Sequence, residues 1–141
     1  MARLALVSKD GHPFLLLGSP GGPRIITAVA ETICNVVDFG MDIQQAVDAA
    51  RFHHQWQPDK IYAEPFAFSA DTGEKLSAMG YQISQQRPWA AVEAILIAPP
   101  AGAGQQAAAG LDDSISRTPV TPGHLYGAND SRRPGGAALG Y

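Results

Sequence analysis

The sequence is poor in cysteine and in charge, and each shortage excludes a class of structure or partner. Cys34 is the single cysteine, so no disulfide can form within the chain. Charged residues make up 16% of the chain, with 10 Lys and Arg against 13 Asp and Glu. The formal net charge of −3 gives no electrostatic basis for binding nucleic acid or an anionic membrane surface. The chain also lacks any apolar run near the roughly 18 residues of a membrane span.

The composition that remains is typical of one folded domain. Hydrophobic residues account for 45% of 141 residues, enough to bury a sizeable core. The apolar stretch at the N-terminus is too short for a signal peptide before it reaches Ser8 and Lys9. The sequence therefore indicates no export signal on this chain and leaves its compartment open. Cys34 falls within an apolar helical pattern, which predicts a buried, unreactive thiol.

Hydrophobic periodicity predicts an α+β fold that begins with a hairpin and two helices. Residues 4–7 and 14–17 are expected to pair around a tight turn at Asp10-Gly11. A long helix is expected after Pro23, with one buried apolar stripe and an end at Phe39-Gly40. The positions assigned to that stripe are Ile26, Val29, Ala30, Ile33, Val36 and Val37. Asp42 is expected to cap a second helix that runs to Ala50, whose apolar face is Ile43, Ala46, Val47 and Ala50.

The second half of the chain predicts shorter elements. An extended connection over 51–56 is followed by a strand near 60–63 and by a helix capped at Ser69 and stopped by Gly80. Leu76 and Met79 are expected to face inward from that helix. Strands are expected at 81–84, 92–97 and 125–127. Residues 101–124 are rich in Ala, Gly and turn formers and are predicted to be a mobile insertion.

The most informative motif is the glycine pair Gly21-Gly22, which lies between an apolar run and a predicted helix. Glycines at a helix entrance leave backbone N–H groups free to face an oxyanion, and the helix dipole favours negative charge there. Pro23 suits the first helical position, where its missing N–H costs no hydrogen bond. A purely structural turn is the alternative interpretation. Phosphate binding is a weaker one, because Pro23-Arg24-Ile25 stands where a phosphate loop carries Lys followed by Ser or Thr.

Metal and cofactor sites find little support in the sequence. His53 and His54 are neighbours, so on an extended chain their side chains point to opposite faces and cannot share one metal ion. No further ligands stand at a zinc-binding spacing. Asp112-Asp113 is the one adjacent carboxylate pair and is expected to be solvated. We therefore predict neither a metal nor a cofactor.

Three separated motifs together resemble the small subunit of the gamma-glutamyltranspeptidases. They stand in the order and spacing of that family, and the closing Gly140-Tyr141 agrees as well. The motifs are Gly18-Ser19-Pro20-Gly21-Gly22-Pro23-Arg24-Ile25-Ile26, Ala49-Ala50-Arg51-Phe52-His53-His54-Gln55-Trp56 and Leu125-Tyr126-Gly127-Ala128-Asn129-Asp130-Ser131-Arg132. The likeness covers residues 1–141 except for the predicted insertion at 101–124, so the whole chain is interpreted as the C-terminal portion of such a subunit.

The resemblance implies a fold and an activity. Members of the family are N-terminal nucleophile hydrolases with a four-layer αββα sandwich, of which this chain would form part. They transfer the gamma-glutamyl group of substrates such as glutathione to water, amino acids or peptides. Gly21 and Gly22 match the two family glycines whose N–H groups form the oxyanion hole. Members are commonly periplasmic, secreted or membrane-attached.

One departure from the family is informative. The nucleophile of the family is an N-terminal Thr that autocleavage exposes, and it precedes the region where the likeness begins. The internal threonines of this chain match no such nucleophile. The sequence therefore predicts an oxyanion hole whose attacking group, large subunit and N-terminal part of the small subunit lie elsewhere, and an isolated chain that is inactive. A non-catalytic remnant or binding scaffold is the alternative.

Overall fold

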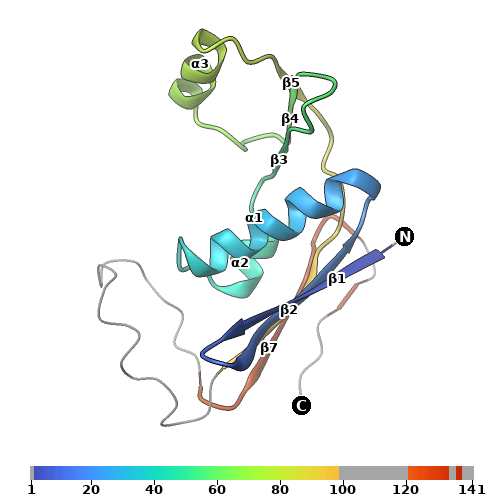
Figure 1. Ribbon diagram of the computed structural model, residues 1–141, viewed down its shortest axis with the longest axis vertical. Helices are drawn as coiled ribbons and strands as arrows, with labels where there is room; N and C mark the ends of the chain where they lie inside the picture. Colours follow the sequence, from blue (N-terminus) through green and yellow to red (C-terminus); the bar gives the residue numbers. More distant parts are fainter. Residues whose placement is uncertain (1, 99–120, 134–135, 138–141) are drawn as a thin grey trace.

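The computed structural model describes residues 2–98, 121–133 and 136–137, and these form two parts of an α+β fold. One part is a four-stranded sheet with the helices α1 and α2, and the other is a three-stranded sheet with the helix α3 (Figure 1). The predicted α+β class is confirmed. Within the described ranges, no helix combines the length and apolar composition that a membrane crossing requires.

The larger sheet is antiparallel throughout and has the strand order β1-β2-β6-β7. Its strands are β1 (Ala2–Lys9), β2 (His12–Pro20), β6 (Glu93–Ile97) and β7 (Leu125–Asn129). Asp10 and Gly11 join β1 to β2 with φ angles of 52° and 80°, so the predicted tight turn is present. The register sets Leu16 between Leu6 and Ile95, which places these three side chains on one face of the sheet.

Helices α1 (Ile25–Val37) and α2 (Ile43–Asp48) cover the opposite face of this sheet. The core forms where buried side chains of the strands meet those of the helices, namely Leu15, Leu17, Val92, Ala94, Ala128, Ala28, Ile43 and Val47. The predicted cap of α2 is confirmed, because Asp42 Oδ1 accepts a hydrogen bond of 2.8 Å from Gln45 N–H. This helix ends at Asp48, and Ala50 is exposed rather than part of its apolar face.

The buried face of α1 differs from the predicted stripe. Ile26 is 73% exposed, and Ala30 and Val37 are exposed as well. The residues that α1 buries are instead Ile25, Ala28 and Thr32, with Val29, Ile33 and Val36 packed at the edge of the core. Burial of Thr32 is possible because its hydroxyl donates a hydrogen bond of 2.9 Å to Ala28 O. Cys34 lies outside this face and is exposed, so the prediction of a buried thiol is wrong.

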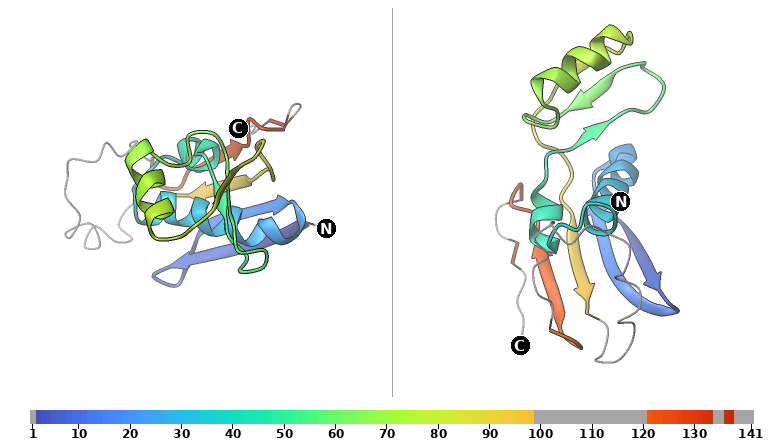
Figure 2. Two further views of the ribbon diagram at one scale, coloured as in Figure 1. Left: turned by 90° about the horizontal axis from the view of Figure 1, so that it is seen from above. Right: turned by 90° about the vertical axis from the view of Figure 1, so that its left-hand side faces the viewer.

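The smaller sheet has the order β3-β4-β5 and extends away from the larger one (Figure 2). Its strands are β3 (Phe52–His53), β4 (Ile61–Ala63) and β5 (Ile83–Gln85). Helix α3 (Ala70–Ala78) connects β4 to the parallel strand β5. This helix buries none of its residues: Leu76 is half-buried, and Met79, just beyond its end, is 72% exposed. The prediction that Met79 faces inward is therefore wrong, because α3 projects from the fold (Figure 1).

Apolar side chains line the face of the larger sheet that α1 and α2 leave free. Leu4 is 76% exposed, and Leu6, Ile95 and Leu125 are exposed too. The strand registers and the alternation of side chains assign these four residues to one face, opposite Leu15 and Leu17. We call these four residues the outer face.

The ends of β6 and β7 approach each other where the predicted insertion begins and ends. Ala98 N–H donates a hydrogen bond of 3.0 Å to His124 O, and Gly123 N–H donates one of 3.3 Å to Ala98 O. Thr121 N–H donates to the Tyr126 hydroxyl at 2.6 Å. Residues 121–124 therefore belong to the hairpin, while the remainder of the predicted insertion at 101–124 lies outside the described residues.

Candidate functional site

The Gly21-Gly22 turn connects the end of β2 to a single 3₁₀ turn, η1 (Gly22–Arg24), which leads into α1. Gly21 has a φ angle of 137° and Gly22 one of 66°, values that residues with a Cβ rarely adopt. A Cβ on Gly21 would lie 3.2 Å from Ala90 Cβ, whereas a Cβ on Gly22 would meet nothing within 4 Å. Neither glycine N–H donates to a backbone group that the structure describes, and both glycines are exposed.

A hollow of about 350 Å³ adjoins this turn. Its lining comes from the turn, from the loop that precedes β6 and from the segment after β7: Pro20, Gly21, Ala90, Ala91, Arg132 and Arg133. Two arginines thus line the hollow together with Gly21. The Arg132 guanidinium donates to Glu64, to Asp130 and to backbone carbonyl oxygens, so the N–H groups of the turn are the donors that would favour an anionic group here.

Arg24, the last residue of η1, stacks between two aromatic rings. Its guanidinium carbon lies 4.7 Å from the centroid of the Trp89 ring and 5.1 Å from that of the Tyr62 ring. Both distances are within the range of a cation–π interaction. The glycine turn is therefore connected through Arg24 to β4 and to the loop before β6.

A buried network of two arginines and two carboxylates adjoins the hollow, which Arg132 helps to line. Arg51 Nη2 lies 2.8 Å from Asp130 Oδ2, and Arg132 Nη2 lies 2.7 Å from Glu64 Oε2. Arg132 also contacts Asp130 at 3.1 Å, which links the two pairs. The two charges of each sign balance, and carbonyl oxygens of residues 47–49 accept further hydrogen bonds from both guanidinium groups. Such compensation is what makes buried charge tolerable.

Opposing effects set the pKa values within this network. Burial alone would raise the pKa of Asp130, but N–H donors from Val92 and Arg132 and the charge of Arg51 outweigh it and hold the pKa below its usual range. Burial would lower the pKa of Arg132, and the hydrogen bonds to Glu64 and Asp130 raise it instead. Asp130 and Arg132 are therefore charged at neutral pH.

This network also fixes the loop that carries Trp89. Trp89 N–H donates a hydrogen bond of 3.1 Å to Glu64 Oε1, and Trp89 O accepts one of 3.4 Å from Arg51 Nη1. The sequence predicts no role for Glu64 or Trp89, and Arg51, Asp130 and Arg132 stand in it only as parts of motifs. The available signal was that three charged residues stand in the motifs shared with a family, although the motifs alone do not pair them.

Glu31 on α1 is a further, half-buried carboxyl group near this network. Burial raises its pKa to about 7, against the lowering effects of the Phe52 N–H and the charge of Arg51. Its Oε2 atom is buried and has no hydrogen-bond partner in the described part of the chain. Glu31 thus titrates near neutral pH although it lies outside the glycine turn.

The side chains of the two adjacent histidines lie in different surroundings, as predicted. His53 is buried, with Nδ1 2.6 Å from the Thr27 hydroxyl and Nε2 3.0 Å from Gln55 Oε1. His54 is more exposed and lies 3.0 Å from Asp59 Oδ1. Among residues 2–98, 121–133 and 136–137, no group of three His, Cys, Asp or Glu side chains is placed to hold a metal ion.

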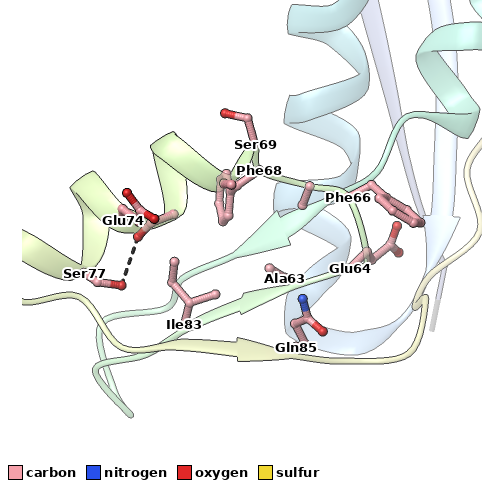
Figure 3. Close-up of a pocket in the computed structure, with 12 residues that line it drawn as sticks. Ala63, Glu64, Phe66, Phe68, Ser69, Glu74, Ser77, Ile83 and Gln85 are labelled. Carbon is pink, nitrogen blue, oxygen red and sulfur yellow. Dashed lines mark hydrogen bonds between the residues drawn. The ribbon is translucent and has the colours of Figure 1, made fainter.

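A second hollow, of about 520 Å³, lies between α3 and the smaller sheet (Figure 3). Ala63, Phe68 and Ile83 supply apolar lining, and Glu74 and Ser77 come from α3. The Ser77 hydroxyl donates to Gly73 O at 2.9 Å, so it serves its own helix rather than a catalytic base. The lining contains no histidine or cysteine, and the glycine turn remains the better candidate for catalytic chemistry.

Comparison with known proteins defines the class to which this fold and turn belong. The sequence model of the gamma-glutamyltranspeptidase family matches residues 1–140. The chain therefore belongs to the gamma-glutamyltranspeptidase family.

Individual relatives agree with this assignment. The chain is 41% identical over 136 residues to the glutathione hydrolase proenzyme of Pseudomonas sp. strain A14 and 35% identical over 136 residues to that of Escherichia coli K12. Each comparison covers 96% of this chain, and 21% and 20% of the respective relative. The crystal structure of the Helicobacter pylori gamma-glutamyltranspeptidase T380A mutant superposes with a TM-score of 0.76 at 36% identity, covering 94% of this chain and 61% of that one. The chain thus spans about a fifth of the length of these curated relatives.

Proposed function

We propose that the Gly21-Gly22 turn is the oxyanion hole for gamma-glutamyl acyl transfer in an enzyme of which this chain forms a part. In this reaction a nucleophile attacks the gamma-carbonyl carbon, and the carbonyl oxygen gains negative charge in the tetrahedral intermediate. Donors fixed at that oxygen stabilise the transition state more than the substrate. The observation that carries the proposal is the turn itself, with two adjacent amides that donate to no described backbone group, beside a hollow that Arg132 and Arg133 help to line.

The names of the relatives support a substrate class for this proposal. Two relatives that match 96% of the chain are named glutathione hydrolase proenzymes. We infer that the donor is a gamma-glutamyl compound such as glutathione and that water, an amino acid or a peptide accepts the acyl group. No threonine of this chain corresponds to an N-terminal nucleophile, whose free α-amino group would act as the base. The nucleophile therefore comes from the part of the relatives that this chain does not match.

The outer face supports a four-layer αββα arrangement for the assembled enzyme. In such a sandwich two sheets pack face to face, each covered by helices on its other side. Here α1 and α2 cover one face of the larger sheet, and Leu4, Leu6, Ile95 and Leu125 leave the other face apolar and exposed. We propose that this outer face receives the second sheet, supplied by the rest of the small subunit and by the large subunit.

The test uses a chimera in which this chain replaces the segment that it matches in the Pseudomonas sp. strain A14 proenzyme. The chimera is expected to release the chromophore from a gamma-glutamyl anilide, and the isolated chain is expected to release none. Gly22→Ala introduces a methyl group into open space but strains a φ angle of 66°, which tilts the donors. The rate of acyl-enzyme formation should fall by about 10²-fold.

Gly11→Ala is the matched control. Gly11 also has a positive φ, 80°, and open space around its Cβ position, but it lies in the β1–β2 turn. Its substitution should leave the rate within about twofold, since only the backbone strain is shared. Equal rates for Gly22→Ala and the unsubstituted chimera would remove Gly22 from the oxyanion hole, and turnover by the isolated chain would show that it holds its own nucleophile.

A further inference from the structure

We propose that Arg24 is a positioning residue that holds the Gly21-Gly22 turn in its reactive geometry through its stacking between Tyr62 and Trp89. This inference rests on the proposed function of the turn. Arg24 would touch no substrate atom, and it would act by fixing the backbone amides that do.

The contacts of Arg24 place it between three parts of the fold. It ends η1, which begins at Gly22, and it is the residue immediately before α1. Its guanidinium carbon is 4.7 Å from the Trp89 ring centroid and 5.1 Å from the Tyr62 ring centroid. Within the described ranges Arg24 forms no ion pair with a carboxylate, so the two rings are the groups that compensate its charge.

The loop on which Arg24 stacks is itself held in place. Glu64 accepts from the Trp89 N–H, and Arg51 donates to the Trp89 carbonyl oxygen. The next residue, Ala90, has a φ of 59° and stands 3.2 Å from the Cβ position of Gly21. The loop therefore meets the turn twice, at Gly21 through Ala90 and at Arg24 through the Trp89 ring. The buried network holds the loop that carries Trp89, and this loop in turn holds the Gly21-Gly22 turn.

The turn needs such support because of its composition. Two glycines at positive φ have the greatest conformational freedom of any residue pair, and neither amide is held by a described backbone acceptor. Donors must be fixed before the reaction in order to stabilise developing charge, and small displacements of catalytic groups cost much of the rate. Loosening the turn should therefore weaken binding of the transition state and leave binding of the substrate nearly unchanged.

The experiment measures kcat and KM of the chimera described above with a gamma-glutamyl anilide, together with its melting temperature. Arg24→Met keeps the aliphatic length and removes the charge, and we expect kcat to fall by about tenfold or more while KM changes by less than about twofold. Arg24→Lys restores a cation above the rings and should recover part of the loss. Trp89→Leu should reproduce the effect of Arg24→Met, and the double variant should be no worse than either single variant because both remove the same contact.

Lys9→Met is the matched control. Lys9 Nζ lies 5.7 Å from the Phe14 ring centroid in the β1–β2 hairpin, so the substitution removes a cation–π pair far from the turn in the sequence and leaves kcat unchanged. Full kcat in Arg24→Met, equal losses in the Met and Lys variants, or losses that add between Arg24 and Trp89 would each overturn the positioning role. An inactive unsubstituted chimera would contradict the proposed function, and the positioning role would fall with it.

Discussion

Glu31 and Phe52 join α1 to the smaller sheet through one carboxylate oxygen. Glu31 Oε1 accepts a hydrogen bond of 3.0 Å from the Phe52 N–H, while Oε2 is buried without a partner in the described part of the chain. Only one of the two oxygens is thus compensated, and burial raises the pKa of this carboxyl group to about 7. The carboxyl group that connects α1 to the smaller sheet therefore changes its charge near neutral pH.

The raised pKa predicts that stability falls as the pH rises from about 4.5 to about 7. Over this interval the folded chain binds more protons at Glu31 than the unfolded chain, so its stabilising contribution is complete below pH 4.5 and lost above the folded pKa. Glu31→Gln keeps the acceptor for the Phe52 N–H and cannot titrate. Urea unfolding of the dilute chain at pH 5 and pH 8 should show a smaller decrease for the variant, by about 1 kcal/mol after allowance for solvent screening. Identical pH profiles would show that Glu31 titrates in the folded state as it does in the unfolded one.

Removing one member of the buried network should destabilise the fold strongly. Asp130→Asn deprives Arg51 of its charge partner at a site where both side chains are buried, and the expected cost is about 3–5 kcal/mol in the free energy of unfolding. The exposed pair of Lys75 and Asp71 on α3 is the matched comparison, and Lys75→Met there should change the free energy of unfolding little. A small effect at Asp130 would mean that the neighbouring N–H donors, rather than the charge, hold this part of the fold.

The outer face predicts that the isolated chain self-associates and binds hydrophobic dyes. Exposed apolar patches on strands are sites of association, and Leu4 and Leu6 are both exposed on the edge strand β1. Leu6→Lys should lower dye fluorescence and shift the sedimentation profile toward monomer without loss of folding, because this side chain lies opposite the core. A monodisperse unsubstituted chain that binds no dye would count against a partly assembled sandwich.

The hairpin end predicts that residues 101–120 can be replaced by a short glycine-containing turn. Ala98 and His124 are already joined by a backbone hydrogen bond, and closure entropy changes slowly with loop length. The stability of the shortened chain should stay within about 1 kcal/mol of the original, provided that Thr121 keeps its contact with Tyr126. A loss of several kcal/mol in urea unfolding would show that the replaced residues pack against the domain.

Local signals in the sequence predicted local structure well. The Asp10-Gly11 turn and the Asp42 cap depend on residues within one turn of the chain, and both are present. The buried face of α1 was harder to predict, because apolar residues occur nearly all around this helix. Periodicity then cannot distinguish Ile25 from Ile26, and only the packing of the helix on the sheet selects the buried one.

Contacts between distant segments could not be predicted from patterns. The glycine pair could be singled out in the sequence because its proposed chemistry is contained in adjacent residues. Arg24, Tyr62 and Trp89 come from η1, β4 and the loop before β6, and no single-sequence rule brings them together. Likewise, the exposure of Met79 follows from the projection of α3 away from the larger sheet, which its own sequence does not specify.

The pairing of Arg51 with Asp130 also constrains how the protein can be made. These residues are 79 positions apart, so during synthesis Arg51 leaves the ribosome long before its partner has been translated. Until then Arg51 has no Asp130 with which to pair, and burying its unpaired charge would be costly. The larger sheet is likewise incomplete, because β7 comes directly before Asp130. Final assembly of this core must therefore follow translation of Arg132, and a nascent chain stopped before that residue should remain open to proteases and chaperones.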